Sequence, residues 1–584
     1  MRSLSSDPTR YAFECFARGD LSEAARCFQD ILTSDPTQPD ALHGMACLAR
    51  ANGRNAVAIA LCGKALKAAE GLPASRLARI HLTLGLALMA EGHSEPARAA
   101  LVVAQTLQPS DPRTSAALGE ALLLLGRRDE AKEAFGEAVR LASDDTDYLT
   151  RLGQIYLEDG QGEQAVICFE TVTRRCAQDG RAWANLGAVL FGLGQYGEAR
   201  ETLLRACELG PRTAETLNNF GLVLMALGDL PQARSVLEEA LSLRPEDGRV
   251  ANSLGTVLME MDEDTVAGAL FRAVMERESG FDREQARFNH ATLLLGQGIF
   301  AQGWKEFESR HSLLGYRPQG SAWDGSSGEE PIAVTAEQGL GDSVQFLRFL
   351  GEAAKRRPLR LQFPAADLVS FMPQLGASRI LDRQGPVESE VSLLSLPFVL
   401  GLEGEPDSKH YLETGLDPAP KTIGVCWAGN PSYRFDSRRS LKPEWLDPLR
   451  NVSGLRLVSL QQGECPDWME KVDLSTLQAL TCAVSQCELV ISVDTLVAHV
   501  AGATGRPFWL LNRRGGDWRW KGVPWYQNVR QFCPDGFLPE DWPLVIERVA
   551  EALRVWEQQP ISLQGVVSVK TAGSHGSGPV EPGP

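Results

Sequence analysis

Residues 182–211 read AWANLGAVLFGLGQYGEARETLLRACELGP, with small residues at fixed places. Gly187 and Ala199 stand where two helices of a pair would touch. Small side chains let helices approach closely, and large ones fill the groove between them. Gly194 separates the two apolar segments, and Pro211 ends the unit because proline cannot continue a helix interior. The stretch therefore predicts one pair of packed helices.

The same pattern recurs every 34 residues over the first half of the chain. This period is typical of stacked helix-turn-helix repeats and resembles the tetratricopeptide repeat, so we expect about nine units between residues 8 and 312. Each unit contacts only its neighbours, and stacking then gives an α-solenoid with a concave surface that suits a bound protein. The recurring residues are Ala97, Ala131, Ala165, Ala199, Ala233 and Ala267; Gly85, Gly119, Gly153, Gly187, Gly221 and Gly255; and Gly92, Gly126, Gly160, Gly194 and Gly228.

Asparagines recur in the inner helices of this predicted solenoid. Asn185 and Asn219 occupy the same place in successive repeats, and Asn252 stands one position earlier in its own repeat. An amide both donates and accepts hydrogen bonds, so a column of such side chains can bind the main chain of an extended acceptor peptide. The arms of protein O-glycosyltransferases are similar. The alternative for these asparagines is a role in packing between repeats. The alternative for the array is a general protein-binding scaffold.

The 34-residue period ends near Trp323, after which short apolar runs alternate with helical stretches. Such alternation predicts parallel α/β sheets covered by helices. A linker at 413–421 divides the region into halves at 323–415 and 421–558. The last residues, 560–584, are rich in Gly, Ser and Pro and are predicted to be disordered. The expected strands are residues 331–337, 359–363, 378–382, 391–395, 422–428, 455–460, 488–494 and 507–512.

Polar loops follow several of these strands, and open α/β sheets bind ligands at the carboxyl ends of their strands. Gly341 and Asp342 follow the first strand; Asp342 faces the ligand, or else is a plain helix cap worth about 1 kcal/mol. Asp494, Thr495 and His499 follow another strand and open a helix, whose free N–H groups suit an anion. A structural role is the alternative for His499.

Two further loops carry candidate binding residues. Asn430 and Arg439 follow the first strand of the second half, and the planar guanidinium of arginine suits phosphate. A solvated basic loop is the alternative. Trp518 belongs to the string DWRW at 517–520, whose aromatic side chains either stack on a base or sugar or close the domain.

Taken together, these strings resemble bacterial tetratricopeptide-repeat proteins with a heptosyltransferase-like domain, and most of all the alphaproteobacterial flagellin glycosyltransferases. The resemblance implies a GT-B fold of two Rossmann-like halves, inversion at the anomeric carbon and no metal. It implies that Asp342 is the catalytic base and that the donor phosphate lies at Asp494–His499 beside Arg439. The strings are FAQGWKEFESRH (300–311), EQGLGDSVQF (337–346), CWAGNPSYRFDSRRSL (426–441), ISVDTLVAHVAGATGRP (491–507), DWRW (517–520) and PWYQNVRQF (524–532).

One string departs from the pattern of that family. Residues 459–463 read SLQQG where the family usually has SLQKG, so Gln461 keeps its place on the donor side while one lysine is replaced by Gln462. The lost charge indicates either a donor with less phosphate charge, such as a CMP-sugar, or a weakened site.

The leading hypothesis is a cytoplasmic protein O-glycosyltransferase. It would move a sugar, such as a nonulosonic acid carried on CMP, to Ser or Thr of flagellin held by the repeats. The nucleotide-sugar is then a co-substrate, and no cofactor is needed. A net charge of -17 and a pI near 5.1 argue against nucleic acid as a partner, and no apolar run is long enough to span a membrane. The alternatives are a non-catalytic adaptor with a degenerate transferase domain and a transferase acting on a lipid-linked saccharide.

Overall fold

The computed structural model divides the chain into two compact units, Met1–Pro211 and Arg212–Pro584. The predicted tail at 560–584 lies outside the described residues. The structure describes residues 7–317, 320–375, 379–381, 383–387, 389–431 and 433–558.

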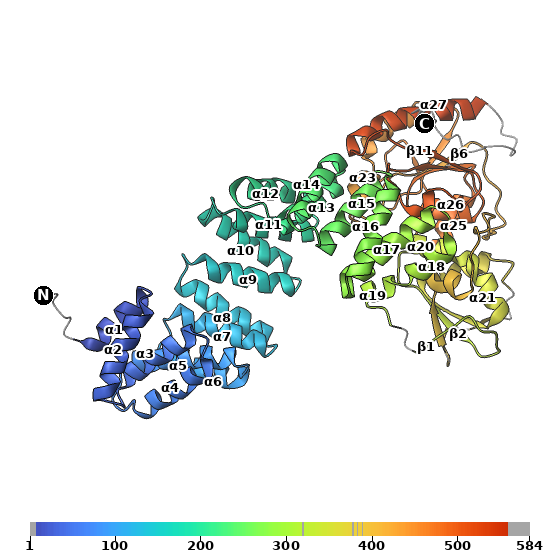
Figure 1. Ribbon diagram of the computed structural model, residues 1–584. Coiled ribbons are helices and arrows are strands. Elements are labelled where there is room, and N and C mark those ends of the chain that lie inside the picture. The colour runs from blue at the N-terminus through green and yellow to red at the C-terminus, as the bar shows by residue number, and fades with distance from the viewer. Residues whose placement is uncertain are drawn as a thin grey trace, which may run out of the picture. The chain divides into compact units, whose positions relative to one another are not determined.

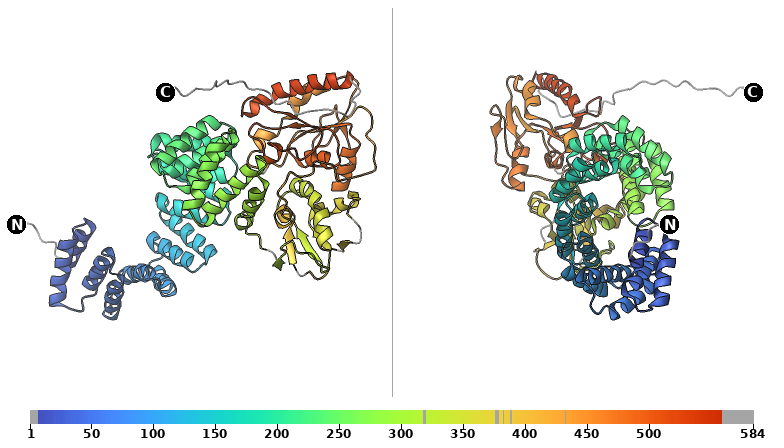
Figure 2. Two further views of the ribbon diagram at one scale, coloured as in Figure 1. Left: turned by 45° about the vertical axis from the view of Figure 1, so that its right-hand side comes forward. Right: turned by 90° about the vertical axis from the view of Figure 1, so that its left-hand side faces the viewer.

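The first unit consists of helix pairs that stack one on the next (Figures 1 and 2). Each pair joins two helices of similar length, as the repeat pattern predicts. The helices are α1 (Pro8–Ala17), α2 (Leu21–Ser34), α3 (Pro39–Ala51), α4 (Asn55–Lys67), α5 (Ala74–Ala90), α6 (Ser94–Leu107), α7 (Pro112–Leu124), α8 (Arg128–Leu141), α9 (Thr146–Glu158), α10 (Gly162–Arg175), α11 (Gly180–Gly192) and α12 (Tyr196–Leu209).

The recurring small residues are the contact points within these pairs. A Cβ atom added to Gly187 of α11 would lie 2.5 Å from Cγ of Leu203 in α12, and one added to Gly119 of α7 would lie 2.6 Å from the ring of Phe135 in α8. The recurring alanines, from Ala97 to Ala267, are all fully buried. The 34-residue period therefore reflects one steric requirement, which recurs once in each pair.

The third series of glycines forms the turns between paired helices. From Gly92 to Gly228 these residues have φ angles between +71° and +92°, a region that glycine enters without steric cost. Asp262 takes the place of glycine in the next repeat and keeps the same left-handed backbone, with φ of 62°. The turn geometry is thus retained where the residue changes.

The second unit begins with helices that continue the repeats. They are α13 (Ala214–Leu227), α14 (Leu230–Leu243), α15 (Gly248–Glu260), α16 (Asp264–Arg277), α17 (Gly280–Gly296), α18 (Phe300–Phe307) and the short α19 (Arg310–Leu314). None of the helices in the described ranges is long and apolar enough to cross a lipid bilayer.

A parallel sheet follows in the order β1-β5-β2-β3-β4, with Ile332 opposite both Leu359 and Ser389. The strand order reverses between β2 and β5, so the loops that follow these two strands lie side by side at the same edge of the sheet. The strands are β1 (Ser321–Ala322), β2 (Ile332–Thr335), β3 (Leu359–Gln362), β4 (Ile380–Leu381) and β5 (Ser389–Ser392), and the α-helices among them are α20 (Leu340–Phe346), α21 (Leu350–Arg356) and α22 (Leu396–Val399).

The second sheet is also parallel and has the order β11-β10-β9-β6-β7-β8. Numbered along its own half, this is the 3-2-1-4-5-6 order of doubly wound α/β folds, which bind ligands where the order reverses, here between β6 and β9. The strands are β6 (Thr422–Cys426), β7 (Arg456–Ser459), β8 (Glu470–Lys471), β9 (Leu489–Val493), β10 (Phe508–Leu511) and β11 (Val529–Phe532); the helices are α23 (Asp436–Arg439), α24 (Asp447–Arg450), α25 (Leu477–Ser485), α26 (Leu496–Ala503) and α27 (Trp542–Gln558).

One continuous hydrophobic core joins the last repeats to both sheets. Trp304 of α18 packs edge-on against Phe346 of α20, at 5.8 Å between ring centroids, and against Trp518 of the second half, at 5.9 Å. The change of sequence period places a boundary near residue 312, whereas the compact packing divides the chain after Pro211. The repeats from α13 onward therefore belong to the same unit as the sheets.

Two glycines of α11 test the steric role of the glycines that recur from Gly85 to Gly255. Gly187→Ala should lower the free energy of unfolding of the first unit by about 1–3 kcal/mol, because the new methyl group overlaps Leu203. Gly192→Ala, in the same helix, is the matched control because its added Cβ meets nothing within 4 Å. Thermal unfolding followed by circular dichroism should show a lower midpoint for the first variant only, and equal midpoints would contradict the packing role.

Candidate functional site

The two strings GLGD and VDTLVAH, far apart in the sequence, meet in the structure. Gly341 lies at the start of α20, and a Cβ atom added there would be 3.0 Å from Cδ2 of His499 and 3.6 Å from the backbone nitrogen of Leu496 in α26. Figure 1 shows α20 beside α26. The loop after β2 therefore rests directly on the N-terminus of the helix after β9, and only glycine fits without displacing His499.

Asp342 is engaged through both carboxylate oxygens. Oδ2 accepts a hydrogen bond of 3.1 Å from the backbone N–H of Gly339, and Oδ1 forms an ion pair with Arg519. Gly339 is the N-cap of α20 and Asp342 is its third residue, so this contact runs from the third residue back to the N-cap backbone and differs from the N-cap role of the structural alternative. Burial raises the pKa of Asp342 above its ordinary value, although Arg519 opposes this effect. The side chain keeps 24% exposure, so it combines a raised pKa with access to solvent.

Arg519 was not among the residues predicted for the site, although it belongs to the DWRW string. Its Nε donates to Oε1 of Gln345 at 2.8 Å and its Nη1 to Oδ1 of Asp517 at 2.8 Å, in addition to the ion pair with Asp342. Burial opposes the charged form of Arg519, but the two carboxylates outweigh it and raise its pKa. Arg519 thus supplies a permanent buried positive charge between the two halves.

Asp494 directly follows β9 and lies beside this charge. Its Oδ1 accepts a hydrogen bond of 2.7 Å from Nε1 of Trp520, and both burial and the nearby Asp517 raise its pKa. Thr495 follows, with its hydroxyl 3.1 Å from Oγ of Ser492. Trp520, which was not among the predicted residues, is the tryptophan that donates to Asp494.

Trp518 lies between the site and the aromatic core, with the guanidinium carbon of Arg519 4.5 Å from its ring centroid. Its ring packs at 5.9 Å from Trp304 and 5.6 Å from Trp525, within the aromatic core. Of the two readings of the DWRW string, closing the domain describes Trp518, and contact with the candidate site describes Trp520.

His499 is a neutral member of the site. Its ring stacks on Trp520 at 5.1 Å, and its Nδ1 shares a hydrogen bond of 3.0 Å with the hydroxyl of Tyr526. Burial and the charge of Arg519 lower its pKa to about 3. At neutral pH this imidazole therefore offers a hydrogen bond to a ligand, but no positive charge.

The loop after β6 contributes the second guanidinium. Arg439 donates from Nη1 to the backbone oxygen of Asp494 at 2.8 Å and pairs with Asp436 at 2.8 Å. Gln461, after β7, accepts hydrogen bonds from the backbone N–H groups of Trp427, at 3.2 Å, and Ala428, at 2.9 Å. Arg439 and Gln461, both predicted for the site, thus shape the loop after β6.

Asn430 stands on the same loop with its side chain exposed. The loops after β6 and β9 flank the point where the strand order of the second sheet reverses. The predicted donor-side residues therefore gather, apart from Trp518, at the edge where doubly wound sheets bind ligands.

The predicted asparagines have different surroundings. Asn185 is half-buried in the first unit, and Asn219 is half-buried in the second. Asn252 is buried and donates a hydrogen bond of 3.0 Å to the backbone oxygen of Asp282 in α17. This contact between helices matches the packing alternative for Asn252.

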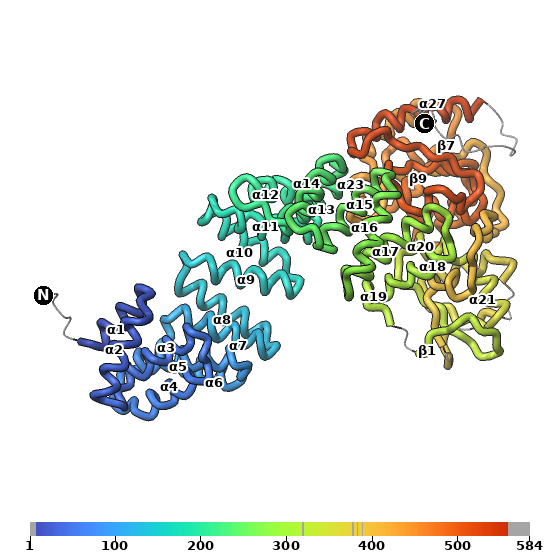
Figure 3. The backbone as a smooth tube through the Cα atoms, in the orientation of Figure 1, coloured from blue at the N-terminus to red at the C-terminus, as the bar shows by residue number. Residues whose placement is uncertain are grey.

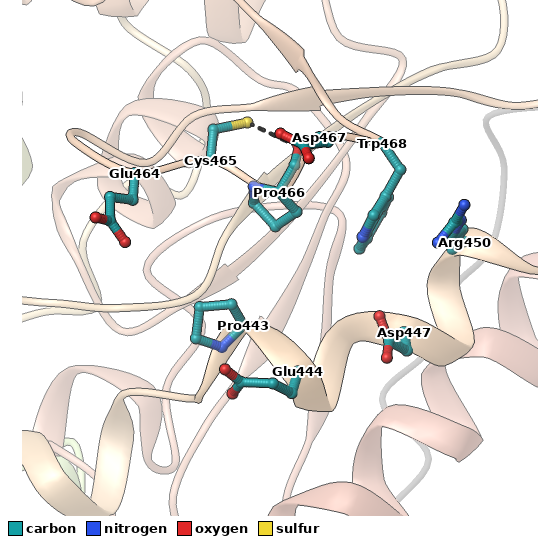
Figure 4. A pocket seen from close by; sticks show the side chains of 9 residues that line it. All are labelled: Pro443, Glu444, Asp447, Arg450, Glu464, Cys465, Pro466, Asp467 and Trp468. Atoms are coloured by element: carbon teal, nitrogen blue, oxygen red, sulfur yellow. Dashed lines mark hydrogen bonds between the residues drawn. The ribbon is translucent and has the colours of Figure 1, made fainter.

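A surface hollow of about 580 Å³ lies in the second half, next to the loop that begins at Gln461 (Figure 4). Carboxyl groups predominate in its lining, with Arg450 as the guanidinium, so the hollow is poorly suited to a phosphate. Its lining residues are Pro443, Glu444, Asp447, Arg450, Glu464, Cys465, Pro466, Asp467 and Trp468. Within the described residues, no group of three or more His, Cys, Asp and Glu side chains is arranged to hold a metal ion.

A buried ionic network supports the loop that carries Gly341 and Asp342. Arg310 of α19 is 1% exposed and pairs with Glu337, two residues after β2, at 2.7 Å, and with Glu308 at 2.6 Å. It also donates to Ser395 at 2.6 Å. Burial alone would raise the pKa of Glu337, but His311, Arg310 and Ser392 lower it to about 2. The last short helix of the repeats thus fixes the strand end that leads into the candidate site.

Comparison with known proteins identifies the repeats. Tetratricopeptide-repeat family models match residues 178–246 in one case and residues 16–73, 116–179 and 218–280 in another. The chain therefore contains tetratricopeptide repeats, as their spacing predicts, and these matches all lie before the first sheet.

Among curated proteins, the chain is 26% identical over 339 residues to protein FlbA of Caulobacter vibrioides, a match that covers 47% of this chain and 55% of FlbA. The chain thus spans about half the length of that relative. Similar solved structures include the C-terminal part of a repeat protein from Cytophaga hutchinsonii (16% identity, TM-score 0.37, 42% of this chain and 99% of that one) and a repeat protein of Thermus thermophilus (21% identity, TM-score 0.27, 32% and 97%).

The Arg310 network gives a pH-dependent prediction. Because the pKa of Glu337 is lowered from 4.5 to about 2, the network stabilises the fold above pH 4.5, and this contribution is lost as the pH falls toward 2. Arg310→Met should lower the free energy of unfolding of the second unit by about 3–5 kcal/mol at pH 7. Urea unfolding, followed by tryptophan fluorescence between pH 7 and pH 4, measures the difference in free energy of unfolding between the wild type and Arg310→Met. This difference should narrow below about pH 4.5.

Lys355→Met provides the control, because Lys355 makes an exposed ion pair with Glu352. It should change the free energy of unfolding by less than about 1 kcal/mol. An Arg310→Met protein as stable as the wild type at pH 7 would show that the network does not support the loop.

Proposed function

We propose that this protein is a glycosyltransferase that moves a sugar from a nucleotide-sugar to a Ser or Thr hydroxyl of a protein bound by its repeats. The observation that carries the proposal is the position of Asp342. A carboxyl group with a raised pKa, partly open to solvent, stands at the carboxyl end of β2. It faces the loops of a second sheet at the place where such sheets bind nucleotides.

In this proposal Asp342 takes the proton from the acceptor hydroxyl as the hydroxyl oxygen attacks the anomeric carbon. A positioned general base typically contributes about 10²–10⁴-fold to the rate, and a raised pKa strengthens it. Arg519 has a carboxylate partner in Asp517 as well, so its charge stays balanced while Asp342 accepts the proton. The pairing with Arg519 also favours the ionised form of Asp342, against the effect of burial.

The leaving phosphate would bind on the side of the second sheet. The N-terminus of α26 offers backbone N–H groups, Thr495 a hydroxyl and Arg439 a guanidinium, which are the groups that stabilise a developing oxyanion. His499 would contribute a neutral hydrogen bond, because its pKa is about 3. The glutamine at 462 then suits a donor with one phosphate, such as a CMP-nonulosonic acid.

Support for the remaining details comes from sequence. The resemblance to heptosyltransferase-like proteins is the reason for placing the proposal in the GT-B, inverting and metal-independent class, and in the cytoplasm. The tetratricopeptide repeats are the part that would bind the acceptor protein. The similarity to FlbA, together with that resemblance, is the reason to begin the search for the acceptor with flagellin.

Asp342→Asn tests the catalytic step in the full chain. The amide can still accept the hydrogen bond from Gly339 but cannot act as a base, so transfer should fall by about 10²–10⁴-fold. Nucleotide-sugar binding, measured by calorimetry, should remain close to that of the wild type. Glu352→Gln, which changes an exposed carboxylate on α21, should leave transfer unchanged.

Three results would contradict the proposal in different ways. Full transfer by Asp342→Asn would remove this residue from the role of base. A wild-type protein that binds no nucleotide-sugar would favour the adaptor, and transfer to a lipid-linked saccharide instead of protein would change the acceptor class.

Flagellin can be tested directly as the acceptor. Mass spectrometry of flagellin from a strain that lacks this gene should show a mass lower by whole sugar units, because the transferred residues would be missing. Restoring the gene should restore the mass, and restoring the Asp342→Asn variant should not. An unchanged flagellin mass in the deletion strain would exclude flagellin as the acceptor.

A further inference from the structure

Glu260, the last residue of α15, lies between two buried arginines of the second sheet region. Its carboxylate pairs with Nη1 of Arg438 at 3.0 Å, and with Arg513 through Nη1 and, at 3.1 Å, through Nη2. Glu260 is 5% exposed, Arg438 2% and Arg513 7%. A single carboxylate from a repeat helix is thus shared by two positive charges that water does not reach.

The two arginines belong to the two loops that form the donor side of the candidate site. Arg438 directly precedes Arg439 in α23, so that one side chain points to the repeat helix and the next points to Asp494. Arg513 follows β10 and leads into the loop that carries Arg519. Glu260 therefore contacts both loops through a single carboxylate.

The backbone around Glu260 is also pressed against the second sheet region. A Cβ atom added to Gly515, whose φ is +66°, would lie 2.0 Å from the backbone oxygen of Glu260. On the neighbouring repeat, a Cβ added to Gly228 would lie 2.4 Å from the backbone oxygen of Phe537. Figure 3 shows α13 and α15 next to α23. This close fit leaves the loops little freedom to shift while the pairs are intact.

Removing the carboxylate would leave two guanidinium groups facing each other in a buried place. Arg438 also donates weakly to the backbone oxygens of Met225 and Arg514, at 3.5 Å and 3.4 Å, and neither contact supplies a negative charge. Repulsion between Arg438 and Arg513 would then push the two loops apart. The displaced segments include Arg439 on one side and the residues before Arg519 on the other.

We propose that Glu260 is a positioning residue: the repeats, through this one carboxylate, hold the two loops of the donor site in their binding geometry. This inference rests on the proposed function, since it assigns Arg439 and Arg519 to a nucleotide-sugar site. It makes the end of the repeat array part of the donor site as well as a surface for the acceptor.

Glu260→Gln in the full chain tests the inference. Because misplacing binding groups by about 1 Å costs on the order of 10²-fold, kcat/KM for the nucleotide-sugar should fall by roughly 10- to 100-fold, mainly through a higher KM. Glu260→Asp keeps the charge and should recover part of the loss. A merely structural role would lower the amount of folded enzyme and leave the KM of the folded fraction unchanged.

The matched control is Asp262→Asn, two residues further along. Asp262 pairs with Lys521 in an exposed contact and has a left-handed backbone that asparagine also adopts. This variant should keep the KM of the wild type. A folded Glu260→Gln protein with the KM of the wild type would overturn the inference.

Hydrogen exchange separates this inference from the proposed function. In Glu260→Gln, peptides covering residues 427–440 and 512–520 should exchange faster than in the wild type, while peptides of the first sheet should not change. This measurement needs no substrate, so it tests the positioning role even if the wild type binds no nucleotide-sugar. Absence of nucleotide-sugar binding would contradict the proposed function alone. Unchanged exchange in both loops would contradict the positioning role. If Glu260→Gln does not fold, Glu260→Asp is measured in its place, with the same expected direction.

Discussion

The insertion of α18 into the core of the α/β region is the contact on which the second unit depends. Trp304 packs against Phe346 from one half and Trp518 from the other, so a single repeat side chain sets the position of both sheets. Aromatic side chains bury large areas and pack edge-on with defined geometry. A chain cut near residue 312 would lose this side chain and expose the surfaces that it covers, although the change of sequence period suggests a boundary there.

Much of the fold can be read from the sequence because its causes are local. The glycine at 187 and its equivalents must be small wherever two helices touch, and this need recurs with every repeat. Seven of the eight apolar runs after residue 323 likewise contain a whole strand, and the run at 391–395 overlaps the end of β5. The strands that the pattern misses are short or polar: β1 and β8 have two residues each, and β11 reads VRQF. Such segments join the sheet because a neighbouring strand offers hydrogen bonds, which no local pattern reveals.

The site is predicted less completely, for a different reason. The loops that meet at Gly341 follow strands of two different sheets, and only the family resemblance, not the strand pattern, implies that they face one site. The direction of individual side chains is decided by the turn that carries them. Trp518 and Trp520 stand two apart on a single 3₁₀ turn, so they point in different directions, and sequence offers no way to choose between them. The partnership of Asp342 with Arg519 joins residues that are 177 positions apart, and Arg438 appears in the sequence as one more charge in a basic loop.

The place where the two compact units divide has a consequence for how such a protein can change. The described helices before residue 212 repeat one module, and within the first unit each module contacts the next. The side chains that contact Asp342 and Arg519 belong to the unit that begins at Arg212. Modules can therefore be gained, lost or exchanged there in steps of 34 residues, while the unit that begins at Arg212 keeps its core and its ionic pairs. Evolution and protein engineering would then have the same route to new partners, which is to change the early modules and leave the second unit as it is.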